Sequence, residues 1–178
     1  MDALNLWPWL VTAVLMFWSV GAYNRLVRLR NAILRCFAPM DRQLEVRSAL
    51  LQQQIELLAA HPGVPSRELE ALQAARAQAD TAWLTAKRQP ASADPMNSLR
   101  LALQILAQVR ERTRAAAAPA AETAQALALR QQLAACDNSL HFAQGQFNDA
   151  VLEYNAALAQ FPAAWLGVVF GFRRAGPL

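Results

Sequence analysis

Apolar residues fill the first part of the chain without interruption. The stretch from Leu4 to Ala22 carries no charged side chain, and its nineteen residues would form a helix of about 28 Å. That length suffices to cross a hydrocarbon core of about 30 Å. Trp7, Trp9 and Trp18 lie near the two ends of the stretch, where indole rings favour the headgroup region. The pattern predicts a transmembrane anchor over residues 1–22, with a short N-terminus ahead of the span.

Basic residues flank only one side of this stretch, and the asymmetry predicts its orientation. Asp2 is the single charged side chain ahead of the stretch, whereas Arg25 and Arg28 follow it closely. Because positively charged flanks stay in the cytoplasm, the N-terminus is expected outside and the rest of the chain inside. The same arginines are expected to contact anionic lipid headgroups. The alternatives are a cleaved signal peptide, which would need a basic segment ahead of the stretch, and a buried core helix.

Beyond the anchor, apolar residues recur at three- and four-residue steps, which is the period of amphipathic helices. Strand signals are almost absent, and residues that favour helices dominate the composition. Breakers that contain Pro or Gly separate four predicted helices, at about residues 23–60, 66–88, 95–114 and 119–161. The first should continue from the anchor and kink at Pro39. Ser66 and Asp94 are the expected N-caps of the second and third helices.

The unequal helix lengths predict the overall shape. The first and last predicted helices reach about 57 and 64 Å, whereas the two between them reach only about 30–35 Å. Because short connections favour antiparallel neighbours, the expected fold is all-α: a transmembrane helix continuous with an elongated antiparallel up-down-up-down four-helix bundle over residues 23–162. The residues expected to face inward include Leu26, Ile33, Phe37, Leu51, Ile55, Leu72, Leu84, Leu99, Leu106, Leu127, Leu133, Leu140, Phe147, Val151, Tyr154 and Phe161.

The last sixteen residues, 163–178, form a separate apolar tail. Trp165, Phe170 and Phe172 are followed by Arg173 and Arg174, a pattern typical of a membrane interface. The apolar part of the tail is too short to cross a bilayer. We therefore expect an interfacial segment beside the anchor. A tail that caps the base of the bundle, and a segment that fills a groove of a partner, are the alternatives.

Composition argues against catalysis and against nucleic-acid binding. The net charge is +4, and several of the arginines lie beside the anchor rather than among aromatic residues on a binding surface. His61 and His141 stand at unrelated places and give no metal site. Cys136, Asp137 and His141 form the one polar group that includes a nucleophile, and their spacing is poor. We expect no enzyme activity, no metal or other cofactor, no nucleic-acid partner and no small-molecule substrate.

Two runs of residues, one after the anchor and one near the end, form motifs. The first comprises Tyr23, Asn24, Leu26, Val27, Leu29, Arg30 and Asn31, and it continues with Phe37, Asp41, Gln43, Leu44 and Arg47. The second comprises Phe147, Asn148, Ala150, Val151, Tyr154 and Asn155, followed by Phe161, Pro162 and residues 170–172. Together they resemble the LemA family. The resemblance implies a bacterial single-pass inner-membrane protein with a cytoplasmic helical bundle and no established catalytic activity.

The asparagines of these motifs suggest a structural role. Asn148 and Asn155 lie seven residues apart and therefore share one helix face. If the last helix returns beside the first, they meet Asn24 and Asn31. Hydrogen bonds between these amides would then fix the register of the two helices, as polar seam residues do in coiled coils. The alternative is that the asparagines face solvent while only the aromatic residues are buried.

Two functional hypotheses follow. The first is a membrane-tethered scaffold or adaptor, for which the resemblance implies contact with membrane metalloproteases. The second is a self-assembling protein that organises or shapes membranes, because an apolar tail accompanies the basic flank and a relative in the LemA family is associated with magnetosome membrane formation. The expected partners are membrane lipids, further copies of the chain or other membrane proteins.

Overall fold

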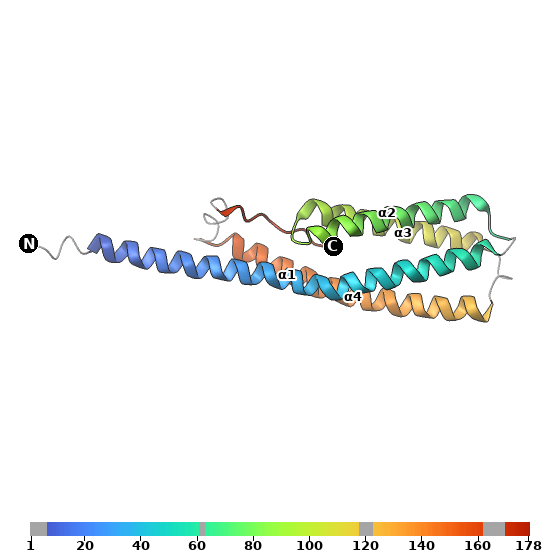
Figure 1. The fold of residues 1–178 in the computed structure, drawn as a ribbon, viewed down its shortest axis with the longest axis horizontal. Coiled ribbons are helices and arrows are strands. Elements are labelled where there is room, and N and C mark those ends of the chain that lie inside the picture. The colour runs from blue at the N-terminus through green and yellow to red at the C-terminus, as the bar shows by residue number, and fades with distance from the viewer. Residues whose placement is uncertain (1–6, 61–62, 118–122, 162–169) are drawn as a thin grey trace, which may run out of the picture.

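The computed structural model describes residues 7–60, 63–117, 123–161 and 170–178. Within these ranges the chain forms four helices and no strand: α1 (Trp7–Ala59), α2 (Ser66–Arg88), α3 (Ala93–Ala116) and α4 (Ala124–Leu158). The all-α prediction is therefore confirmed. Figure 1 shows an elongated molecule in which the first part of α1, in blue, extends beyond the other helices.

The first helix has two halves of different character. α1 is 53 residues long and continues through Pro39 as one element. None of residues 7–25 is buried, whereas the buried positions begin at Leu26 and recur every three or four residues as far as Ile55. The first half of α1 therefore lies outside the core, and the second half is a core helix.

The helices pack as two pairs that are joined by α1. α1 contacts α4 extensively, α2 contacts α3, and a smaller contact connects α1 with α2. Along the first pair, Arg25 meets Gln160 and Phe37 meets Phe147. Residue numbers thus rise along α1 as they fall along α4, so the C-terminal end of α4 lies beside the junction between the exposed and the buried halves of α1.

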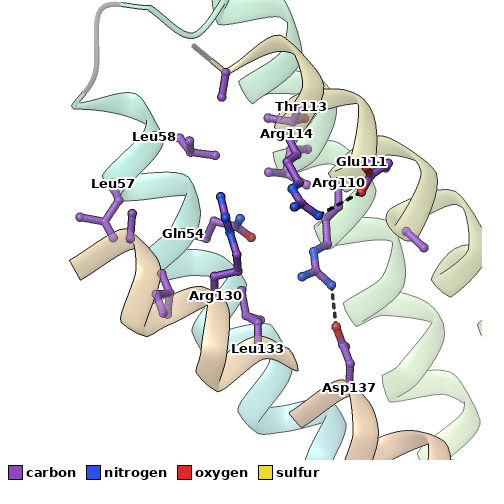
Figure 2. Close-up of a pocket in the computed structure, with 15 residues that line it drawn as sticks. Gln54, Leu57, Leu58, Arg110, Glu111, Thr113, Arg114, Arg130, Leu133 and Asp137 are labelled. Carbon is purple, nitrogen blue, oxygen red and sulfur yellow. Dashed lines mark hydrogen bonds and ion pairs between the residues drawn. The ribbon is translucent and has the colours of Figure 1, made fainter. Parts of the chain in front are cut away.

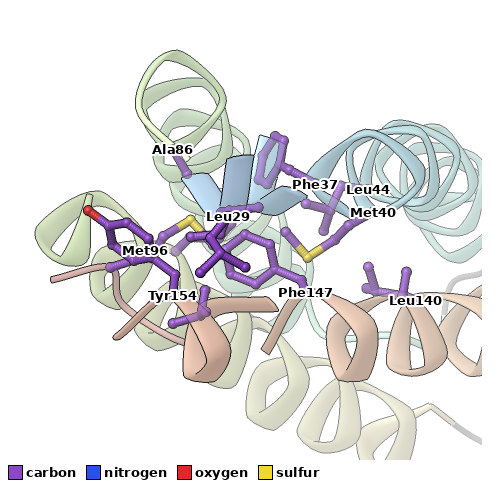
Figure 3. Packing of buried hydrophobic residues seen from close by; sticks show 14 of the residues in the cluster. Leu29, Phe37, Met40, Leu44, Ala86, Met96, Leu140, Phe147 and Tyr154 are labelled. Carbon is purple, nitrogen blue, oxygen red and sulfur yellow. The ribbon is translucent and has the colours of Figure 1, made fainter. Parts of the chain in front are cut away.

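The core consists of two clusters of apolar side chains, one after the other along the bundle. The first cluster surrounds Phe37 of α1 and Phe147 of α4, whose rings meet edge to face with their centroids 6.1 Å apart (Figure 3). The second cluster includes Leu51, Ile55, Leu72, Leu106 and Leu133. Each cluster contains residues from all four helices, so burial of apolar surface holds both helix pairs together.

Several predicted helix ends differ from the structure. Pro65, rather than Ser66, is the N-cap of α2, and Ser66 is already helical. Ser92 is the N-cap of α3, so Asp94 lies in the first turn. Its negative charge interacts favourably there with the helix dipole. α4 begins five residues later than expected because Thr123 caps it: the Thr123 side chain accepts a hydrogen bond from the Ala126 N–H at 3.1 Å.

Three residues that we predicted to face inward are exposed. Leu84, Leu127 and Phe161 are 53, 47 and 65% exposed. On α2 the buried positions include Ala79 and Ala86, which are seven residues apart, and Leu84 falls outside that stripe. Small alanines replace large residues where α2 packs, so residue size misled the prediction. Phe161 lies beyond the end of α4.

Candidate functional site

The first half of α1 presents apolar side chains outward. Trp7, Trp9 and Phe17 are 71, 72 and 81% exposed. Among the described helices, α1 is the one that is long and apolar enough to cross a membrane. A contiguous apolar surface of this kind is unusual on a soluble protein. This half of α1 is therefore a candidate membrane span; Leu4, the predicted first residue of the span, lies outside the described residues.

The residues directly after α4 meet α1 at the last turns of this candidate span. The rings of Trp18 and Phe161 pack edge to face with their centroids 5.2 Å apart. Two turns further along α1, Arg25 Nη1 donates a hydrogen bond to Gln160 Oε1 at 3.1 Å. A cavity of about 330 Å³ lies between these contacts, and Arg28 is exposed on the next turn. The predicted interface residues Trp18, Arg25 and Arg28 thus gather where the bundle begins.

The described part of the tail, residues 170–178, lies against the bundle and reaches the turn between α2 and α3 (Figure 1). Phe170 and Phe172 contact Tyr23 of α1, with ring centroids 5.1 and 5.7 Å apart. Ala175 is buried in the first core cluster, and Leu178 packs against that cluster. These residues therefore cap the base of the bundle, which was the alternative to an interfacial segment. Hereafter "the tail" means residues 170–178.

Two asparagines of α4 hold the tail by its main chain. Asn155 Nδ2 donates to the Ala175 carbonyl at 2.9 Å, and Asn155 Oδ1 accepts from the Ala175 N–H at 3.0 Å. Asn148 makes the same two bonds with Leu178, at 2.9 and 2.8 Å. Each side-chain amide therefore pairs with one residue of the tail as a peptide group would, and contacts no side chain of the tail through these bonds.

Tyr154 completes this arrangement from the core side. Its ring is buried in the first core cluster (Figure 3), and its hydroxyl donates to the Arg173 carbonyl at 3.0 Å. Burial raises the pKa of Tyr154 above its ordinary value, although nearby Arg30 opposes the shift. The hydroxyl is thus a neutral donor at physiological pH. We call Asn148, Tyr154 and Asn155 the tail clamp.

Gly176 lets the tail approach α3 closely. A Cβ atom at this position would lie 2.8 Å from Ala93 Cα and 3.0 Å from the Ala93 carbonyl oxygen. Because both atoms belong to the backbone, neither can move aside as a flexible side chain would. Glycine at this position and the clamp together fix the tail between α4 and the start of α3.

The asparagines therefore do not pair across α1 and α4, and the predicted register role is wrong. Asn24 and Asn31 are exposed, and Asn148 and Asn155 bind the tail. Each of the latter follows a buried aromatic residue by one position, which places it about 100° further round the helix. The aromatic residues face α1 and the core, so the amides point to one side, where the tail lies.

The motif residue Asp41 connects α1 with α2. Asp41 Oδ1 accepts a hydrogen bond from Trp83 Nε1 at 2.8 Å, and Asp41 Oδ2 lies 2.9 Å from Lys87 Nζ. Lys87 Nζ also lies 5.4 Å from the centroid of the Trp83 ring. One carboxylate thus orients two side chains of α2, and its contacts are structural.

An ionic cluster joins three helices at the far end of the bundle. Asp137 of α4 accepts from Arg47 Nε of α1 at 2.8 Å and lies 3.0 Å from Arg110 Nη1 of α3. Burial lowers the pKa of Arg47. Figure 2 shows Asp137 and Arg110 beside a cavity of about 520 Å³, into which Arg114 and Arg130 also project.

The thiol of Cys136, the nucleophile of the polar group noted in the sequence, is held inside the bundle. Cys136 is a buried free thiol, and its Sγ lies 3.4 Å from the Gln43 carbonyl oxygen, to which it donates. Burial raises the pKa of this thiol, and the charge of Asp137 raises it further, so little reactive thiolate forms. His141 is exposed. Within the described ranges no three His, Cys, Asp or Glu side chains gather closely enough to hold a metal ion.

The tail residues that meet the clamp were missed from the sequence. Ala175, Gly176 and Leu178 lie in a short extended segment, which has no helical periodicity to reveal its partners. The signal that was available is a Gly-Pro pair after an apolar segment, together with two asparagines seven residues apart. Pro162 and Trp165, which we assigned to the closing motif and to the membrane interface, lie outside the described residues.

Comparison with known proteins identifies the family. The chain matches no curated protein significantly. The sequence profile of the LemA family matches residues 36–177. That range contains most of the bundle, the tail clamp and almost all of the tail, so the chain belongs to the LemA family.

Proposed function

We propose that this protein is a single-pass scaffold or adaptor, anchored in a bacterial inner membrane with its N-terminus outside and its bundle in the cytoplasm. The observation that carries the proposal is the continuity of α1. Residues 7–25 are unburied and largely apolar, whereas Leu26 begins the core of the bundle within the same helix. Because no loop separates the two halves, the anchor would set the orientation of the bundle directly.

In this proposal residues 1–22 are the anchor, residues 23–162 an up-down-up-down four-helix bundle, and residues 163–178 a membrane-proximal C-terminal segment that includes the tail. From Leu26 to Ala59, α1 extends for about 50 Å. The turn after α1 would therefore stand about that far from the bilayer, where its surface meets cytoplasmic proteins. Partners of the scaffold would be other membrane proteins, a membrane metalloprotease among them.

The proposal includes no catalytic step. The polar groups described above already have structural partners: Asp41 binds α2, and Asp137 binds Arg47 and Arg110. Catalytic groups, by contrast, need a free face toward a substrate. A protein whose charged residues hold its helices together fits a scaffold better than an enzyme.

Membrane extraction tests the anchor. Two arginines in the span (Val14→Arg with Leu15→Arg) should release the protein into the supernatant after alkaline carbonate treatment, because each costs about 2.5–3.5 kcal/mol in a bilayer. The matched control places two arginines at exposed apolar positions of the bundle (Leu101→Arg with Ile105→Arg) and should stay in the membrane pellet with the wild type. Wild-type protein in the supernatant would refute the anchor.

Reporter fusions test the orientation. A fluorescent protein fused after Leu178 should fluoresce, whereas a periplasmic phosphatase fused there should stay inactive. The opposite pair of results would place the bundle outside and would contradict the proposed orientation while leaving the anchor intact.

A second candidate function is membrane organisation by lateral self-assembly. It is favoured by the tail clamp, because Asn148 and Asn155 bind main-chain atoms that every copy of the chain carries. A deletion of residues 163–178 should then reduce the assembled mass in mild detergent, whereas a plain adaptor would keep the same mass.

A further inference from the structure

We propose that the tail clamp is a receptor for an extended chain segment and that it accepts the tail of a second copy of this protein as well as its own. Exchange of tails would then join neighbouring copies in the membrane. The inference rests on the proposed anchoring, because a membrane brings copies together in one plane and in one orientation. It assigns a chemical basis to self-assembly, namely main-chain recognition by two side-chain amides.

The spacing of the clamp fits an extended chain. Asn148 and Asn155 are separated by seven helical residues, or about 10.5 Å. The residues that they bind, Ala175 and Leu178, are three apart, and a chain with three residues per turn advances about 9.3 Å over that distance. Such a chain also turns residues i and i+3 to the same side, and Pro177 fixes one φ at the required value. The clamp therefore matches a segment with this backbone geometry.

The clamp places few demands on the sequence of its occupant. Its five hydrogen bonds all go to main-chain atoms of residues 173, 175 and 178. The specific requirements are glycine at 176, where a Cβ would meet Ala93, and small or apolar residues at Ala175 and Leu178, which join the core cluster. Every copy of the chain carries this segment. A tail from a neighbour would therefore bind as the resident tail does.

The chain is long enough to exchange its tail. Fourteen residues lie between Leu158, the last residue of α4, and Arg173, and fully extended this connection spans about 50 Å. Two helices packed side by side are about 20 Å across, so the clamp of an adjacent bundle lies within reach. Exchange of an identical element between copies costs little, because the exchanged tail forms the same hydrogen bonds and apolar packing in either bundle. Confinement to a plane raises the effective concentration of neighbouring tails.

Complementary variants test tail exchange. The acceptor is the full anchored chain without residues 173–178, so its clamp is empty. The donor keeps the tail but carries Asn148→Asp with Asn155→Asp, which removes both amide donors. When the two are co-expressed with different affinity tags and solubilised in mild detergent, acceptor and donor should co-purify, whereas acceptor with acceptor and donor with donor should not. A synthetic peptide of residues 170–178 should abolish the co-purification.

A matched control separates the clamp from general effects of charge. Asn138 lies on α4 and is exposed, so an acceptor that also carries Asn138→Asp should capture the donor as well as the acceptor does. An acceptor that also carries Asn155→Asp should capture it about tenfold less, the ratio expected for one lost hydrogen bond of ordinary strength. Equal capture by all three acceptors would overturn the role of the clamp.

The possible failures are distinguishable. If the acceptor is helical by circular dichroism and binds the labelled peptide but not the donor, the clamp holds the tail only within one chain and tail exchange is wrong. If the helical acceptor does not bind the peptide, the clamp is no receptor. Both variants are also extracted with alkaline carbonate. Their presence in the membrane pellet would support the proposed anchored scaffold in either case, even though tail exchange had failed.

A photocrosslinking experiment in a chain that keeps both its tail and its clamp tests tail exchange even if the acceptor does not fold. A photoreactive benzoylphenylalanine replaces Phe172, which contacts Tyr23. Illumination of membranes should give a product of twice the monomer mass beside the internal crosslink. The double-mass product should disappear when the peptide of residues 170–178 is added in excess. Internal crosslinks alone, at every expression level, would overturn tail exchange.

Discussion

Asp137 and Arg47 form an ion pair between α4 and α1, with Arg47 Nε 2.8 Å from Asp137 Oδ1. The Arg47 side chain is 9% exposed, whereas that of Asp137 is 37% exposed. The second oxygen of Asp137 binds Arg110 of α3 at 3.0 Å. One carboxylate thus neutralises a buried cation and also ties the α2–α3 pair to the α1–α4 pair at a place where α3 and α4 otherwise contact little.

Replacement of Asp137 by asparagine should destabilise the protein strongly. Asp137→Asn keeps the volume but leaves two neighbouring guanidinium groups, one of them buried, without a counter-charge. We expect a loss of about 2–4 kcal/mol in the free energy of unfolding, measured by circular dichroism in detergent. The control is Glu111→Gln, which removes an exposed ion pair with Arg114 at 3.9 Å and should cost less than about 0.5 kcal/mol. Equal effects of both substitutions would contradict the ranking.

Two glycines should respond to alanine with opposite signs. Gly176→Ala forces a Cβ against the Ala93 backbone, so we expect a loss of about 1–3 kcal/mol and release of the tail. Gly145 lies exposed inside α4 with nothing within 4 Å of an added Cβ. Gly145→Ala should therefore stabilise the protein by about 0.5–1 kcal/mol, because alanine favours a helix. Thermal unfolding of the two variants measures both effects, and stabilisation by Gly176→Ala would show that the tail does not dock against α3.

The hydrophobic pattern predicted the helices well because each helix buries a single stripe. Leu26, Ile33 and Phe37 on α1 follow the helical period and are buried as expected. Leu84 was misplaced because α2 packs mainly through alanines. A stripe that is traced through the largest apolar residues of this helix therefore lies on the wrong face. The sequence indicated both a candidate anchor and a core helix in α1, because the first charged residue of this helix, Arg25, directly precedes its first buried residue, Leu26.

The candidate site could be predicted only in part. Asn148 and Asn155 were recognised as a structural pair from their seven-residue spacing, but their partner was assigned wrongly. A side-chain amide binds any exposed peptide group equally well, so nothing in the asparagines themselves distinguishes a neighbouring helix from the tail. Asp137 was grouped with Cys136 because they are adjacent in sequence, whereas its ionic partners come from helices far away along the chain.

Loss of one clamp amide should expose the tail to proteolysis. Asn155→Asp removes the donor to the Ala175 carbonyl and sets a carboxylate oxygen against it. The tail should then detach more often, and trypsin should cut after the exposed Arg173 and Arg174 about tenfold faster, because cleavage requires local opening. Cleavage is followed by mass spectrometry at low protease concentration. Asn138→Asp on the same helix is the control, and an equal acceleration by it would exclude a specific effect of the clamp.

The burial of Tyr154 should make stability depend on pH above the neutral range. Its folded-state pKa lies above the ordinary value of about 10. Because the unfolded chain loses this proton first, the contribution of Tyr154 to stability is fully present below pH of about 10 and is lost as pH rises through the folded-state pKa.

The substitution Tyr154→Phe tests this dependence. It should cost about 1 kcal/mol at pH 8, through the lost bond to the Arg173 carbonyl. Above pH of about 10, the stability of this variant should decline less steeply than that of the wild type. Unfolding curves at pH 8, 9.5 and 10.5 measure the difference, and Tyr23→Phe should leave the stability at pH 8 unchanged within about 0.5 kcal/mol. Parallel decline of the wild type and Tyr154→Phe would mean that Tyr154 ionises as readily in the folded protein as in the unfolded chain, and the tail would then not shield it.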